Sequence, residues 1–224
     1  DVQALAPISH PKEMGESISH VVYKLQHSML YPLLFKNAFG DSSISGEKIL
    51  KAMAQFQLTL TSSNSKYDGV KKGAFSFSTQ ENAGYVIFKN NCNSCHTEPL
   101  FSTYEFANNG LKIDTTLMDY GRWQVTKNKK DSLLFKIPSL RNLSYSYPYM
   151  HDGRFKKLNQ VLNHYTSSIH ENPLVSNELT KSITLTPNEK NDLIAFLLTL
   201  NDSTFIYNQE NKFPKNLLLP NKGN

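Results

Sequence analysis

Apolar residues recur with the spacing of α-helices along much of the chain. The first clear pattern begins after Glu16 and falls on one face of a 3.6-residue helix, at Ile18, Val21, Val22, Leu25 and Met29. Pro32 interrupts it, and a second helix is expected to follow. Ser45 can cap a third helix, whose predicted buried stripe is Ile49, Met53, Phe56 and Leu60. The polar stretch at 61–69 then marks a candidate boundary.

Two later helices carry a start signal of their own. Ser78 and Glu81 form a capping box, in which each residue can satisfy the other's backbone N–H. Thr186 and Glu189 repeat this arrangement before the broad apolar face of residues 192–200. The sequence therefore predicts an all-α protein.

The remaining segments carry weaker signals. Loops, short helices and a small β-hairpin near Trp123 are expected between these two capped helices. The tail after Asn201 is expected to be irregular.

Composition narrows the classes of protein that remain. A chain of 224 residues with 39% hydrophobic residues can bury a sizeable core, and no apolar run reaches the 18 residues of a membrane span. The net charge is +5, but the basic residues are scattered and the densest cluster is only Lys127–Lys130, which argues against nucleic-acid binding. No signal peptide begins at Asp1, so the chain is expected to come from a longer one.

The only two cysteines, Cys92 and Cys95, are followed directly by His96. In a C-x-x-C-H motif both sulfurs can form thioethers with a haem while the histidine binds its iron, and this interpretation is favoured. A zinc site would need two more ligands, for which His151 or His164 could serve. A redox-active dithiol normally follows a strand, whereas a helix is predicted before these cysteines.

Several longer stretches carry a more specific resemblance. They are "CNSCHTEPLFS", "DYGRWQVT", "FKIPSLRNLSYSYPYMHDGRFKKLNQVLNHY" and "DLIAFLLTL". Together they resemble the carboxy-terminal haem domain of the bacterial di-haem cytochrome c peroxidase and MauG family. The segment before them is similar to the end of the family's amino-terminal haem domain. The resemblance implies a helical remnant of that peroxidatic domain with the crossover at residues 1–72, and a cytochrome c-like haem domain with an irregular tail at 73–224.

The same resemblance implies a function for the intact protein. It would be a periplasmic haem c oxidoreductase that reduces hydrogen peroxide and passes electrons or oxidising equivalents between two haems. This chain holds one attachment motif, and the second haem would lie in a missing upstream domain. The implied partners are a small electron-donor protein or a protein substrate, and a homodimer stays open. A mono-haem electron-transfer cytochrome c and a zinc-stabilised interaction domain are the alternatives.

The sixth iron ligand is not decided by chemistry alone, since thioether, imidazole and phenolate side chains all bind haem iron. In the family this ligand lies seventeen residues beyond the proline of the "PYMHDG" loop, and counting from Pro148 reaches Tyr165. The resemblance therefore implies Tyr165, as in MauG-like members, with Met150 as the rival. Without the resemblance, Tyr165 would be interpreted as a core aromatic on a helical stripe.

The resemblance implies roles for four further residues. Gln3 and Glu13 match the pair that family members place over the peroxide-binding haem, where Glu13 would move the proton and Gln3 would orient peroxide. On its own, Glu13 would be interpreted as a solvated acid near a helix start. Backbone carbonyls of Ser146 and Pro148 match positions that help to bind calcium in the family.

Overall fold

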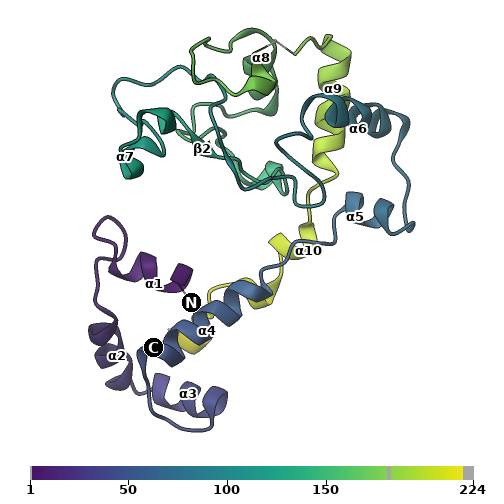
Figure 1. The fold of residues 1–224 in the computed structure, drawn as a ribbon. Coiled ribbons are helices and arrows are strands. Elements are labelled where there is room, and N and C mark those ends of the chain that lie inside the picture. The colour runs from purple at the N-terminus through teal and green to yellow at the C-terminus, as the bar shows by residue number, and fades with distance from the viewer. Residues whose placement is uncertain (1, 181–182, 219–224) are drawn as a thin grey trace, which may run out of the picture. The chain divides into compact units, whose positions relative to one another are not determined.

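The computed structural model describes residues 2–180 and 183–218, and it divides the chain into two compact units (Figure 1). One consists of Asp1–Thr61 with Tyr207–Asn224, and the other of Ser62–Ile206. The predicted boundary after residue 72 lies later than this division, so residues 62–72 belong to the second unit. The reason is packing, because Tyr67 is 2% exposed and its ring meets Phe101 edge-on at 4.8 Å.

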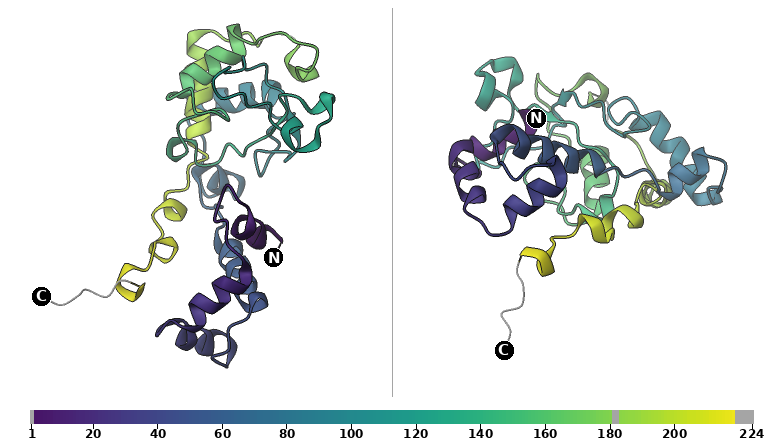
Figure 2. Two further views of the ribbon diagram at one scale, coloured as in Figure 1. Left: turned by 90° about the vertical axis from the view of Figure 1, so that its left-hand side faces the viewer. Right: turned by 90° about the horizontal axis from the view of Figure 1, so that it is seen from below.

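The first unit is helical throughout its regular structure (Figure 2). Its elements are α1 (Val2–Ser9), α2 (Ile18–Gln26), α3 (Tyr31–Phe39), α4 (Gly46–Thr59), the 3₁₀ turn η4 (Gln209–Asn211) and α11 (Lys215–Leu218). The three helices predicted here are confirmed, with Ser17 and Ser45 capping α2 and α4. The expectation of an irregular tail after Asn201 is corrected, because the tail contains the short helical elements α10 (Ser203–Ile206), η4 and α11.

The buried stripe predicted on α4 is longer than the part of the helix that the core of the first unit actually covers. Phe35, Ile44 and Ile49 form its buried centre, with Met53 packed against them. The other two predicted members, Phe56 and Leu60, are exposed. The helix presents only its first turns to this core, so the pattern overestimated the length of the buried face.

The second unit contains most of the structure. Its elements are α5 (Lys66–Lys71), α6 (Thr79–Asn91), β1 (Phe106–Ala107), α7 (Trp123–Thr126), η1 (Lys129–Asp131), β2 (Phe135–Lys136), η2 (Leu143–Tyr145), α8 (Leu158–Ser167), η3 (Asn177–Leu179), α9 (Pro187–Leu198) and α10 (Ser203–Ile206). Both predicted capping boxes are present, at the starts of α6 and α9. The expected hairpin is a two-stranded antiparallel pair, in which Phe106 faces Lys136 and Ala107 faces Phe135, while Trp123 itself is helical.

Helices α6 and α9 pack directly against each other and form the centre of the second unit (Figures 1 and 2). Gly84 makes this close approach possible, since a Cβ atom there would lie 1.9 Å from the carbonyl oxygen of Asp192. Phe88 and Phe196 are completely buried, with ring centroids 5.1 Å apart. The pair of helices therefore holds the end of α6, and with it Cys92, in a fixed position.

Candidate functional site

A cavity of about 500 Å³ lies in the second unit. Cys92, Cys95 and His96 line it, together with Met150 and Tyr165. The rest of its wall is largely apolar and comes mainly from the segment after β2 and from helices α8 and α9: Ile137, Leu140, Leu143, Leu158, Val161, Leu162, Leu193 and Leu197. The size and apolar lining are those of a cofactor pocket.

The C-x-x-C-H motif forms one tight turn at the end of α6. The backbone N–H of Cys92 donates to the carbonyl of Phe88 at 2.8 Å and so continues the helix. The N–H groups of Cys95 and His96 then both donate to the carbonyl of Cys92, at 3.3 and 2.9 Å. These bonds bring both sulfurs and the imidazole to the same cavity wall.

His96 is oriented by two backbone carbonyls. Its Nδ1 lies 3.2 Å from the oxygen of Phe101 and 3.1 Å from that of Pro138, so this nitrogen carries the proton and donates. The pKa of His96 is lowered, chiefly by burial, which favours the neutral ring. A neutral imidazole whose Nδ1 is engaged has its Nε2 lone pair available for a metal.

The two sulfurs are free thiols. Burial raises the pKa of Cys92 to about 12 and also raises that of Cys95, so neither resembles an activated redox thiol. The zinc alternative is not supported, because the described parts of the chain contain no group of three or more His, Cys, Asp or Glu residues that could hold a metal ion. Its proposed ligands are engaged elsewhere: His164 Nε2 contacts the carbonyl of Asn109 at 2.9 Å, and His151 Nδ1 lies 3.2 Å from Asp119.

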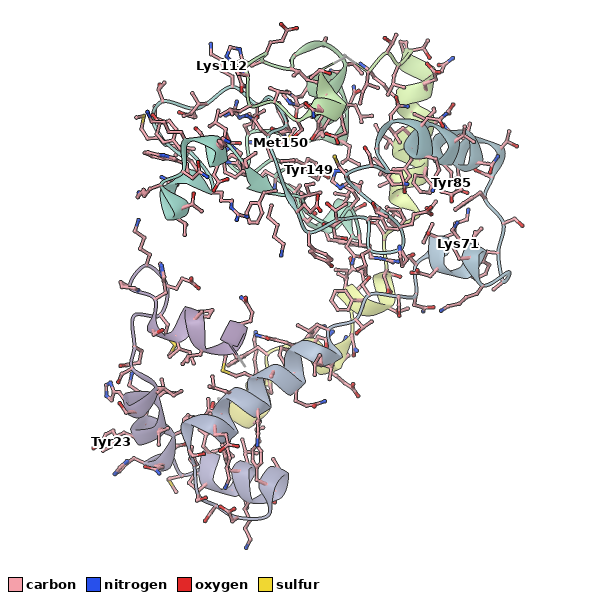
Figure 3. The ribbon with its side chains drawn as sticks, viewed as in Figure 1. Tyr23, Lys71, Tyr85, Lys112, Tyr149 and Met150 are labelled. Atoms are coloured by element: carbon pink, nitrogen blue, oxygen red, sulfur yellow. The ribbon has the colours of Figure 1, made fainter. Side chains whose placement is uncertain are left out.

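Tyr165 and Met150 reach the cavity from different elements. Tyr165 lies on α8, and Met150 lies in the loop before it, next to Tyr149 (Figure 3). The hydroxyl of Tyr165 and the sulfur of Met150 are each 3.5 Å from Nδ2 of Asn109. Tyr165 is therefore a cavity-lining residue with its polar end directed to Asn109, and burial raises the pKa of its phenol. This placement is the one that an iron ligand requires, and a buried tyrosine of the core would also find a partner for its hydroxyl.

These residues fit a c-type haem. Two thiols at the required spacing, an imidazole with a free Nε2 and a phenol or thioether line one apolar cavity. The fit depends on the chemistry of the donor set and on the engaged Nδ1 of His96.

The segment directly after the motif is anchored by the side chain of Glu98. Glu98 accepts hydrogen bonds from Tyr67 at 2.5 Å, Tyr85 at 3.0 Å and Lys89 at 3.0 Å, which fix the loop to α5 and α6. The Lys71 and Tyr85 side chains meet at 2.8 Å on the same surface (Figure 3). This cluster holds the chain immediately beyond His96.

The segment that carries β1, α7 and β2 leaves the motif at residues 100–105 and returns at residues 137–140. Four hydrogen bonds join these two ends and form the base of the segment. Ser102 Oγ donates to the carbonyl of Ile137 at 2.7 Å, and Ser139 Oγ donates to that of Leu100 at 2.6 Å. The N–H of Leu140 donates to the carbonyl of Phe101, and that of Ile137 to Glu105. The two carbonyls that orient His96 therefore lie where the outgoing and returning chains meet.

The predicted calcium positions, Ser146 and Pro148, line the same cavity. A turn follows them, with Gly153 at φ +70° and Arg154 Nε donating to Asp152 at 2.8 Å. This ion pair fixes the loop that carries Met150.

Gln3 and Glu13 lie in the first unit and are both exposed. Gln3 is on α1, whose buried side is formed by Ala4 and Ile8. Glu13 follows the helix, and its carboxylate lies 3.8 Å from His10 Nδ1. Within the described residues, Glu13 has the surroundings of a solvated acid.

Sequence reasoning missed Asn109, which contacts both candidate ligands, and Pro138, whose carbonyl orients His96. The only local signal at Asn109 is the dipeptide Asn109–Gly110, which is typical of a turn. Neither role could be read from spacing, because each contact joins segments far apart in the chain.

Comparison with known proteins gives two family matches. Residues 1–76 match the family described as di-haem cytochrome c peroxidase, and residues 82–201 match the family described as cytochrome c. The second match covers the motif, the cavity and α9.

Individual relatives agree with these matches. The chain is 36% identical over 205 residues to the methylamine utilization protein MauG of Methylophilus methylotrophus, covering 88% of this chain and 60% of that protein. It is 36% identical over 165 residues to the cytochrome c551 peroxidase of Nitrosomonas europaea, covering 71% and 49%. A crystal structure of a MauG-like protein associated with microbial copper homeostasis superposes with a TM-score of 0.80 at 28% identity, over 95% of this chain and 71% of the other.

Proposed function

This chain belongs to the di-haem cytochrome c peroxidase and MauG family, and on that premise we propose that it is part of a haem c oxidoreductase that reduces hydrogen peroxide. It spans about 60% of the MauG relative, so the activity is proposed for the whole protein. The observation that carries the proposal is the cavity in which Cys92, Cys95 and His96 meet Tyr165. The match of residues 1–76 to the di-haem family favours this over a mono-haem electron-transfer cytochrome.

The residues of the second unit would bind and orient one covalent haem. When bound, the haem supplies reversible one-electron oxidation and reduction. Cys92 and Cys95 would fix it through thioethers, and His96 would bind iron through Nε2 while Phe101 and Pro138 hold its Nδ1–H. The apolar wall would exclude water from the iron.

Tyr165 is the proposed sixth ligand. A phenolate favours ferric over ferrous iron, whereas a methionine raises the reduction potential. Choosing Tyr165 over Met150 therefore implies a haem that stores or passes oxidising equivalents within the di-haem protein. A conventional peroxidase with a methionine ligand would be suited to accepting electrons from a donor protein.

Glu13 and Gln3 are proposed to act at the second haem of the intact protein. The Glu13 carboxylate would take a proton from the inner oxygen of peroxide and return it to the outer oxygen, while the Gln3 amide would orient the peroxide. Their exposure in this chain is compatible with a role that depends on the remainder of the protein.

The finer assignments follow from the same family. The carbonyls of Ser146 and Pro148 would contribute to a calcium site completed by residues outside this chain.

The intact protein would act in the periplasm with a small electron-donor protein or a protein substrate, and a homodimer is compatible with this. Across residues 2–180 and 183–218, the structure contains no helix with the length and apolar character needed to cross a membrane.

A haemochrome spectrum of the denatured protein tests the attachment site. One covalent haem is expected for each copy of this chain, and replacing Cys92 and Cys95 by Ala should remove it. Ser94→Ala is the matched control and should retain the haem, because Ser94 lies between the two attachment points. Absence of covalent haem from the unaltered protein would contradict the proposal, and two haems would contradict the single motif.

The Tyr165→Phe variant tests the ligand. Its ferric absorption spectrum should change, since the phenol oxygen is lost while the ring is kept. Met150→Leu should leave the ferric ligation unchanged. The opposite pair of results would assign the ligand to Met150.

A further inference from the structure

Asn109 directs its amide nitrogen toward the two candidate iron ligands. Its Oδ1 accepts a hydrogen bond from the backbone N–H of Leu111 at 3.2 Å. This bond fixes the orientation of the amide, because the reversed group would place its nitrogen against that N–H. Nδ2 therefore faces Tyr165 and Met150, each at 3.5 Å.

The two contacts use the two hydrogens of one amide group. A side-chain amide has two N–H donors, and both a phenol oxygen and a thioether sulfur can accept. Both contacts are at the long end of the range for such bonds. A negatively charged phenolate accepts shorter and stronger hydrogen bonds than a neutral phenol, so the bond to Tyr165 would gain most from iron binding.

The position of Asn109 is fixed from three sides. His164 Nε2 donates to its carbonyl at 2.9 Å, and His164 is 2% exposed and adjacent to Tyr165 on α8. Asn108, which is 1% exposed, accepts a hydrogen bond from the N–H of Gly110 at 2.9 Å. Gly110 has φ +68°, and a Cβ there would lie 2.5 Å from Ile169. The amide is thus held rigidly, as a group that supports a ligand must be.

We propose that Asn109 is a positioning residue for the iron ligand. One N–H of its amide holds the oxygen of Tyr165, and the other holds the sulfur of Met150. This inference rests on the proposed haem site. A hydrogen bond to a bound phenolate draws electron density from its oxygen and weakens its donation to iron. Asn109 therefore raises the reduction potential of this haem above the value that an unsupported phenolate would give. It also gives Met150 a partner that keeps its sulfur off the metal.

The inference is tested on the haem-loaded protein by redox titration and by the resonance Raman spectrum of the ferric phenolate. Asn109→Leu should shift the midpoint potential of this haem to a more negative value and strengthen the iron–oxygen vibration. Asn109→Asp keeps the acceptor for Leu111 but loses both donors and adds a negative charge, so its potential should also fall. Asn163→Leu is the matched control, because Asn163 lies on α8 with Tyr165 but its Oδ1 accepts a hydrogen bond from Lys190 at 2.9 Å. The potential of this variant should be unchanged.

The outcomes separate the two proposals. If Tyr165→Phe changes the ferric spectrum but Asn109→Leu shifts neither the potential nor the vibration, the role of Asn109 is refuted and the Tyr165 ligand stands. If Tyr165→Phe leaves the spectrum unchanged, the ligand assignment and the role of Asn109 both fail. Should Asn109→Leu not fold, an unchanged or raised potential in Asn109→Asp refutes the inference.

Discussion

The contact between α6 and α9 at Gly84 leads to a prediction of large effect. In Gly84→Ala the added methyl group would lie 1.9 Å from the carbonyl oxygen of Asp192 and 2.9 Å from Cβ of Phe196. The first of these obstacles is backbone, so no side-chain rotation relieves it. The two helices must move apart, and Phe88 and Phe196 lose part of their packing.

The magnitude follows from two opposing terms. Overpacking a tight interior costs about 1–3 kcal/mol, and a backbone obstacle places this site at the upper end. Ala has a higher helix propensity than Gly, which offsets about 1 kcal/mol. We expect a net loss of about 2 kcal/mol in the free energy of unfolding, or about 4–8 °C in Tm for a protein of this size.

Thermal unfolding followed by circular dichroism and by haem absorbance measures this change. Val86→Ala is the matched control, since Val86 is on the same helix and 52% exposed, and its effect should stay within about 0.5 kcal/mol. A neutral or stabilising Gly84→Ala would show that the helices are not in direct backbone contact and would refute the reasoning.

Three further predictions concern a buried ion pair and the proposed acid. The side chains of Arg141 and Asp68 are 12% and 11% exposed and form an ion pair at 2.8 Å. Arg141→Met would leave the Asp68 carboxylate without this partner, so it should lower the free energy of unfolding by about 3 kcal/mol in urea titrations. A loss under about 1 kcal/mol would contradict this. Burial disfavours the Asp68 charge, but hydrogen bonds from Arg141 and Ser65 lower its pKa to about 2, so its stabilising effect is complete above about pH 4 and is lost as the pH falls toward 2. The stability difference between the unaltered protein and Asp68→Asn should shrink over that interval and stay constant above pH 5. Glu13→Gln should slow peroxide consumption by the intact di-haem protein roughly 100-fold or more with little loss of stability, and an unchanged rate would make Glu13 an ordinary solvated acid.

The elements that the sequence predicted well are those decided by neighbouring residues. The capping boxes at Ser78 and Thr186 place the starts of α6 and α9, because every partner lies within three residues. The C-x-x-C-H turn is equally local, since the backbone N–H groups of Cys92, Cys95 and His96 donate to carbonyls three or four residues earlier.

What the sequence could not predict depends on contacts between distant segments. Phe56 is exposed because the core of the first unit does not extend to the later turns of α4, and the spacing of apolar residues does not indicate how far a core extends. Asn109 faces Tyr165 across 56 positions of sequence, and Pro138 reaches His96 across 42. Side chains whose role is set by a partner so far away carry no signal in their own neighbourhood.

The hydrogen-bonded base of the segment between Ser102 and Ile137 separates the tip of that segment from His96. Since the Phe101 and Pro138 carbonyls on either side of that base hold the His96 imidazole, the tip beyond it can be lengthened, shortened or exchanged without moving the ring. Loop grafts at residues 112–130 should therefore leave both contacts of His96 in place and retain cofactor incorporation.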